Sequence, residues 1–123
     1  MKKISIILLL LILPSANAFE KTDNFTLETF ISAKKSGKTI VVNSWNKNCT
    51  TCKKQTKIFK EAQKDFKNVI FFYYEQTKNK DIAEFLKIDY WTTIVIYKDS
   101  KEIARSIGST NKNEIYDLIK KGI

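Results

Sequence analysis

The sequence predicts an α/β protein built on one central mixed β-sheet of about four strands, with helices on both faces. Stretches with apolar residues at helical spacing alternate with short continuous runs of β-branched and aromatic residues. Continuous apolar strands require cover on both faces of a sheet, which the intervening helices can provide. Asp99-Ser100, a hairpin turn pattern, lies between the last two strands, which indicates that these strands are antiparallel neighbours.

The first 18 residues are set apart from this fold. They have a cationic start, an apolar run over residues 4–13 that only Ser5 interrupts, and a small-x-small end at Ala16-Asn17-Ala18, a pattern typical of a secretory signal peptide. The run has only about half of the roughly 20 apolar residues that span a bilayer. We therefore expect cleavage after Ala18, a single domain over residues 19–123, and an exported, periplasmic protein.

The first half of the domain is expected to run helix, strand, helix, strand. Residues 25–33 carry apolar side chains at helical spacing, and Gly37 can end that helix. Thr39–Trp45 is apolar and β-branched, as in a buried strand. The second helix is indicated by four apolar residues at helical spacing, namely Ile58, Phe59, Ala62 and Phe66. Val69–Tyr74 then predicts the second strand, parallel to the first because a helix joins them.

The second half is expected to run helix, strand, strand, helix. A short helix begins after Asn79, with apolar residues at Ile82, Ala83, Phe85 and Leu86. Thr93–Tyr97 and Glu102–Ile107 predict the two strands of the hairpin. Asn111 and Glu114 have the spacing of an N-cap and its partner, which indicates the start of the last helix.

The net charge of the chain is strongly positive, and lysine supplies almost all of the positive charge. The formal net charge is +9, yet Arg105 is the only arginine, and the lysines are scattered among acidic residues. Proteins that read nucleic acids depend on arginine for bidentate contacts to phosphates and bases. Binding to nucleic acid is therefore not expected, and the charge indicates a solvated surface that favours acidic partners.

Cys49 and Cys52 are the only cysteines. A structural disulfide stabilises a fold most when it closes a long loop, and this pair closes almost none, so it suits a dithiol that opens and closes. The pair follows a buried strand and begins a helix, whose N-terminus would lower a thiol pKa with help from Lys47, Lys53 and Lys54. We expect Cys49 to be the nucleophile and Cys52, one turn inside the helix, to be the resolving thiol.

This element order, with a cysteine pair at the first junction of strand and helix, resembles the thioredoxin family. The resemblance extends from Asp23 to Lys121 and is carried, besides the cysteines, by Asp23-Asn24-Phe25, Trp45, the strand Thr93–Lys98 and Gly108. It implies a thioredoxin fold and a redox-active disulfide between the two cysteines. It also implies a substrate groove flanked by Trp45, Trp91 and Thr92.

The sequence departs from the family pattern at four places. Asn43 takes the position of a buried acidic residue, and Thr50-Thr51 between the cysteines lacks the proline of the classical reductants. Thr92 takes the position of the family's cis-proline; a cis bond before any other residue costs about 2.5–4 kcal/mol, so the Trp91-Thr92 bond is expected to be trans. The family's first strand is expected to be missing, because little chain precedes the first helix.

The leading hypothesis is an exported thiol–disulfide oxidoreductase that exchanges disulfides with protein thiols through Cys49 and Cys52. The resemblance favours a reductant that needs no cofactor or metal. Its electrons are expected to come from a membrane-bound thiol donor, since no soluble nicotinamide-linked reductase is expected outside the cytoplasm.

Two other functions stay open at this point. A dimer could share a metal ion or an iron–sulfur cluster through two cysteine pairs, and Thr92 favours this because the family's proline helps to keep metals off the cysteines. One chain could not complete a four-ligand zinc site from nitrogen and sulfur, since it has no histidine. The other alternative is a non-catalytic module of the same fold that holds a partner in its aromatic groove.

Overall fold

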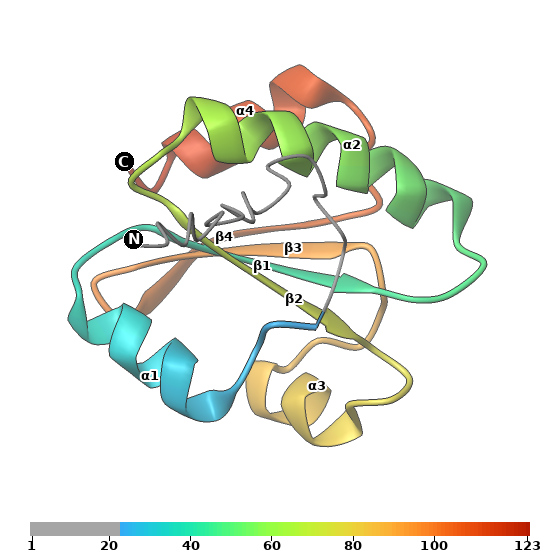
Figure 1. Cartoon of the computed structure of the whole chain (residues 1–123), viewed down its shortest axis with the longest axis horizontal. Coiled ribbons are helices and arrows are strands. Elements are labelled where there is room, and N and C mark those ends of the chain that lie inside the picture. The colour runs from blue at the N-terminus through green and yellow to red at the C-terminus, as the bar shows by residue number, and fades with distance from the viewer. Residues whose placement is uncertain (1–22) are drawn as a thin grey trace, which may run out of the picture.

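The computed structural model describes residues 23–123, so the expected signal peptide lies outside the described residues. A four-stranded sheet lies between α2 and α4 on one side and α1 and α3 on the other (Figure 1). Eight elements follow one another along the chain in the expected order: α1 (Leu27–Lys35), β1 (Ile40–Trp45), α2 (Thr50–Asp65), β2 (Ile70–Glu75), α3 (Lys80–Leu86), β3 (Thr93–Lys98), β4 (Lys101–Ile107) and α4 (Lys112–Lys120). None of the helices in this part of the chain is long and apolar enough to cross a bilayer.

The sheet is mixed, and its strand order is β2-β1-β3-β4. β1 and β2 are parallel, with Val42 opposite Phe72. β3 is antiparallel to β1 and to β4. The predicted parallel pair and antiparallel hairpin are therefore both confirmed, and the sheet is the four-stranded mixed sheet of the thioredoxin fold.

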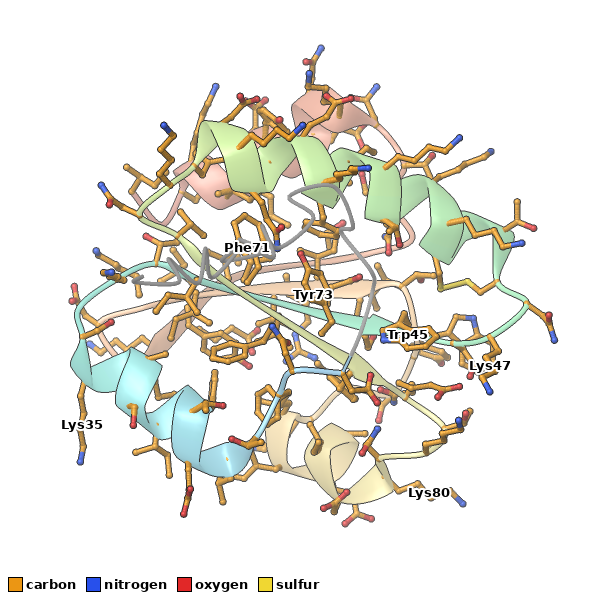
Figure 2. The ribbon with its side chains drawn as sticks, in the orientation of Figure 1. Lys35, Trp45, Lys47, Phe71, Tyr73 and Lys80 are labelled. Carbon is orange, nitrogen blue, oxygen red and sulfur yellow. A yellow bond between two sulfur atoms is a disulfide. The ribbon has the colours of Figure 1, made fainter. Side chains whose placement is uncertain are left out.

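Each face of the sheet has its own hydrophobic core. Val41 and Val42 are adjacent in β1 and both are fully buried, on opposite faces, as a strand covered on both sides requires. Phe71 and Tyr73 of β2 point toward α2 (Figure 2), where they pack with Phe59. Burial raises the pKa of Tyr73 far above its usual value, so its hydroxyl stays protonated beside Gln63.

α1 presents a narrower apolar side than its sequence predicts. Phe30 and Ala33 are buried, whereas Leu27 and Ile31 are 48% and 43% exposed. Phe25 is also buried, but it precedes the helix. Thr26 is the N-cap of this helix and forms a capping box with Thr29 in the first turn. Gly37, at φ +73°, follows the end of the helix, as expected.

Asn24 covers the outer edge of β2. Its backbone N–H donates to the carbonyl of Tyr73 at 3.1 Å. Its side chain accepts from the Tyr73 N–H at 2.7 Å and donates to the carbonyl of Phe71 at 3.0 Å. In residues 23–123 no strand precedes α1, and this single asparagine satisfies part of the edge that another strand would pair with.

Side-chain hydrogen bonds and a tight turn fix the elements of the second half of the chain. The Asn111 side chain accepts from the Glu114 N–H at 3.1 Å, which confirms the predicted N-cap of α4. Asp99 and Ser100 have φ values of +50° and +65°, as in the tight turns that join antiparallel strands. Arg105 of β4 donates to the carbonyls of Leu86 and Lys87 at the end of α3, which lack partners within that helix.

Candidate active site

The two cysteines lie at the junction of β1 and α2. Cys49 is the N-cap of α2, in extended backbone, and Cys52 lies in the first turn of the helix. Their sulfurs form a disulfide, and the Cα atoms are 5.2 Å apart. The Cys52 N–H donates to the Cys49 Sγ at 3.1 Å, so the sulfur takes the place of the oxygen that usually caps a helix.

The two cysteines differ in their exposure to solvent. Cys52 is 3% exposed, whereas Cys49 is half-buried and lies at the open end of the helix. The 16-residue α2 has no acidic residue in its first turn. Its unpaired N–H groups and positive dipole end therefore favour a negative charge on Cys49 when the disulfide is open. This is the condition that thiol–disulfide exchange places on its attacking sulfur.

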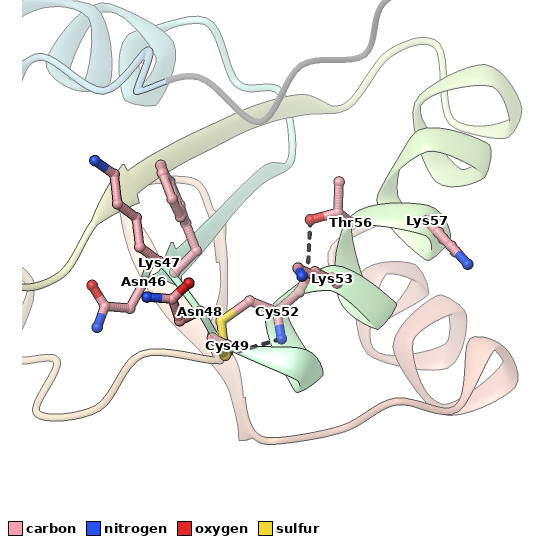
Figure 3. A pocket seen from close by; sticks show the side chains of 9 residues that line it. Asn46, Lys47, Asn48, Cys49, Cys52, Lys53, Thr56 and Lys57 are labelled. Atoms are coloured by element: carbon pink, nitrogen blue, oxygen red, sulfur yellow. Dashed lines mark hydrogen bonds between the residues drawn. A yellow bond between two sulfur atoms is a disulfide. The ribbon is translucent and has the colours of Figure 1, made fainter.

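A cavity of about 460 Å³ opens beside the disulfide. Residues 46–48 line it on one side and residues of α2 line it on the other, with the disulfide between them (Figure 3). Trp45 lies at the end of β1 near Lys47 (Figure 2) and also lines the cavity. Its indole N–H donates to Asp23 Oδ1 at 3.1 Å, which fixes the orientation of the ring.

Asn43 and Gln55 form a buried amide pair between β1 and α2. Both side chains are fully buried. The Asn43 Nδ2 donates to Gln55 Oε1 at 3.2 Å and to the carbonyl of Thr93 at 3.1 Å. The Gln55 Nε2 donates to the carbonyls of Thr92 and Ser109, each at 3.0 Å. Among the described residues, the Asn43 Oδ1 has no hydrogen-bond partner.

Gln55 is a site residue that the sequence analysis missed. It lies three residues after Cys52, on the side of α2 that also buries Phe59 and Ala62. A glutamine among residues that are otherwise apolar or sulfur-bearing was the available signal, because a buried amide needs dedicated partners.

Thr92 is held in an unusual backbone conformation. Its φ is +68°, a strained value for a β-branched residue. Its N–H donates to the carbonyl of Ser44 at 2.8 Å, and its own carbonyl accepts from Gly108 as well as from Gln55. No peptide bond in residues 23–123 is cis, so the bond between Trp91 and Thr92 is trans.

Two of the three residues predicted to flank a groove, Trp45 and Trp91, line separate cavities. Trp45 lines the cavity of the disulfide, whereas Thr92 is buried and lines none of the described cavities. Trp91 is 44% exposed and lines a separate hollow of about 590 Å³ against α3. Contact of Trp45, Trp91 and Thr92 with a substrate stays a prediction. In the described part of the chain no group of three or more His, Cys, Asp or Glu side chains could hold a metal ion.

Comparison with known proteins gives consistent matches. A family model described as Thioredoxin matches residues 19–121. The chain is 35% identical over 92 residues to thioredoxin H-type from Fagopyrum esculentum, covering 75% of this chain and 78% of that protein. It is 33% identical over 92 residues to a thioredoxin from Mycoplasma genitalium, covering 75% and 87%.

Solved structures agree with these matches. Trxlp from Edwardsiella tarda gives a TM-score of 0.75 at 21% identity, over 77% of this chain and 94% of that chain; this likeness concerns the fold alone. The thioredoxin of Fasciola hepatica gives a TM-score of 0.70 at 26% identity, over 79% and 91%.

Proposed function

The chain belongs to the thioredoxin family, and we propose that it reduces disulfide bonds of exported proteins through Cys49 and Cys52. It is a thioredoxin-like thiol–disulfide oxidoreductase with this cysteine pair as its redox centre. The direction of electron flow, the compartment and the roles of the two sulfurs are the proposed parts.

The proposed reaction moves two electrons from the reduced pair to the substrate. The Cys49 thiolate attacks one sulfur of a substrate disulfide; that S–S bond breaks, and the released substrate thiolate takes a proton from water. Cys52, deprotonated, then attacks the Cys49 sulfur of the mixed disulfide and releases the second substrate thiol. The protein is left with the Cys49–Cys52 disulfide, the state that the structure contains. A dithiol donor reduces this bond and becomes a disulfide itself.

The observation that carries this proposal is the unequal exposure of the two cysteines at the N-terminus of α2. Cys49 is accessible at the cavity, as an attacking sulfur must be. Cys52 is buried and bonded to Cys49, so it can reach the mixed disulfide but not an external substrate. This arrangement supports Cys49 as the nucleophile and Cys52 as the resolving thiol.

Export to the periplasm is proposed from the sequence. The cationic start, apolar run and Ala16-Asn17-Ala18 support cleavage after Ala18. A reductant in that compartment needs electrons from across the membrane, so we include a membrane-bound thiol donor in the proposal.

Trapping of the mixed disulfide tests the exchange reaction. In the Cys52→Ser protein, expressed in its native host, the captured substrate cannot be released, because the resolving sulfur is absent. We expect covalent adducts at Cys49 that disappear on reduction, detected by non-reducing electrophoresis and mass spectrometry after rapid alkylation.

The matched control is the Cys49→Ser protein, which retains one sulfur but only the buried one. It should form almost no adducts, and its activity on protein disulfides should fall to background. Absence of adducts from Cys52→Ser, or the same adducts from both variants, would contradict the proposed function.

A further inference from the structure

The charged side chains that line the cavity at the disulfide are all positive. Its lining includes Lys47, Lys53 and Lys57 and no acidic residue. Lys54, also exposed, follows directly in the first turns of α2. In residues 23–123 none of these four lysines forms an ion pair with a carboxylate. The positive end of the α2 dipole points to the same place, so the potential at the cavity is positive.

The charges of α2 are divided along its length. From Thr50 to Lys60 the helix contains four lysines and no acid, and both of its acids, Glu61 and Asp65, follow in the second half. These two acids are engaged by α4: Glu61 pairs with Lys112 at 2.7 Å, and Asp65 accepts from the Tyr116 hydroxyl at 2.7 Å. These two acids therefore stabilise the contact between α2 and α4. Neither of them neutralises the positive charge at the end of α2 that carries the disulfide.

The carboxylates near Trp45 already have hydrogen-bond or ion-pair partners. Asp23 accepts from the Trp45 indole N–H and from the Asn79 side chain, the latter at 3.2 Å. Glu75 is 3% exposed and pairs with Lys78 at 3.2 Å. Neither lines the cavity, so a negative partner at the disulfide would meet lysines rather than these two acids.

From this arrangement we infer that the substrates are protein segments in which acidic residues flank the cysteine that Cys49 attacks. The inference rests on the proposed function and adds a substrate class to it. Trp45 and the disulfide supply the apolar part of the cavity, and the lysines around them attract negative charge. Such attraction raises the rate of encounter and is weakened by salt.

Three synthetic peptides test this inference. They are identical except that a pair of glutamates, glutamines or lysines flanks each cysteine of their single internal disulfide. The pre-reduced protein is mixed with each peptide, and the second-order rate of peptide reduction is followed by chromatography after acid quenching. We expect the acidic peptide to react about tenfold faster than the basic one at low ionic strength, and the difference to shrink at about 0.5 M salt.

A matched pair of variants locates the effect. Changing Lys47, Lys53 and Lys57 together to glutamine should bring the ratio of acidic-peptide to neutral-peptide rates close to one. The ratio cancels any change in the reactivity of Cys49, which both peptides share. Changing three exposed lysines distant from the cavity, Lys35, Lys101 and Lys120, removes the same net charge and should leave the ratio unchanged.

The outcomes separate the two proposals. Equal rates for the three peptides, or an equal loss of preference in both triple variants, would overturn the substrate class while disulfide exchange stands. If none of the peptides is reduced, the proposed function falls and the substrate class falls with it.

Discussion

Asn43 and Gln55 connect the helix that carries the cysteines to the loop around Thr92. Four hydrogen bonds join their amides to each other and to the backbone carbonyls of three residues, Thr92, Thr93 and Ser109. A φ of +68° at Thr92 stores strain on the order of 1–3 kcal/mol, which the surrounding contacts must offset. The amide pair is therefore a local device that holds this loop beside α2.

The surroundings of Asn43 predict how a carboxyl would behave there. Its side chain touches two neutral acceptors, Gln55 Oε1 and the Thr93 carbonyl, and it is fully buried. In the Asn43→Asp protein, burial should raise the pKa of the introduced carboxyl well above about 3.9, its unfolded value. The folded state then binds more protons than the unfolded state, so the free energy of unfolding falls as pH rises.

We expect Asn43→Asp to lose about 2–4 kcal/mol of stability relative to the unmodified protein between pH 5 and pH 8. Urea denaturation at the two pH values measures this loss. Asn68→Asp, at an exposed position, introduces the same charge and should show almost no such difference. A loss that is no larger at pH 8 than at pH 5 would mean that the buried site stabilises a carboxylate.

Residues of distinctive chemistry were predictable one by one, and buried amides were not. The cysteines, Trp45 and the Asn111 cap each belong to a recognised local pattern, and the structure places them accordingly. Gln55 belongs to no such pattern. Its role depends on Thr92 and Ser109, which lie 37 and 54 residues away in the chain, and single-sequence periodicity does not show such partners.

At the level of elements, hydrophobic period and turn chemistry were sufficient to predict the order of all eight helices and strands. The apolar face of α1 was predicted less well, because Leu27 and Ile31 have helical spacing but face away from the sheet. Periodicity predicts which residues share a side of a helix, whereas the fraction of that side that becomes buried depends on how the helix docks.

The hairpin between β3 and β4 yields a prediction at this scale. Ser100 has a φ of +65°, where glycine has no steric penalty and serine does. Ser100→Gly should therefore raise the free energy of unfolding by about 0.5–1 kcal/mol, as measured by urea denaturation.

The same chemical change should have the opposite sign in a helix. Ser32 lies exposed in α1, so Ser32→Gly should lower stability by about 0.5–1 kcal/mol. Destabilisation by both substitutions would show that the turn does not need positive φ in solution.

On the scale of the whole molecule, the disulfide lies outside both hydrophobic clusters. The two cores are formed by side chains on the two faces of the sheet, and neither includes a cysteine. We therefore expect the reduced protein to keep its fold. The difference in unfolding free energy between the oxidised and reduced forms then links stability to reduction potential, since about 30 mV corresponds to 1.4 kcal/mol.

For the proposed reductant the oxidised form should be the more stable one, by roughly 1–3 kcal/mol, because the closed pair restricts the unfolded chain. Urea denaturation of both forms, with the reduced form kept under dithiol, measures the difference. A reduced form more stable than the oxidised one is the property of strong oxidants, and it would reverse the proposed direction while leaving exchange intact.

Arg105, the single guanidinium of the protein, is bound to the end of α3 and to Glu102, away from the disulfide cavity. Every cation that lines the cavity is therefore an ammonium group on a flexible stem. An ammonium attracts negative charge from any direction, whereas a guanidinium selects for a planar, two-point approach. Substrates of unrelated shape are therefore expected to bind in many orientations. They are selected by the sign of their charge rather than by shape complementarity.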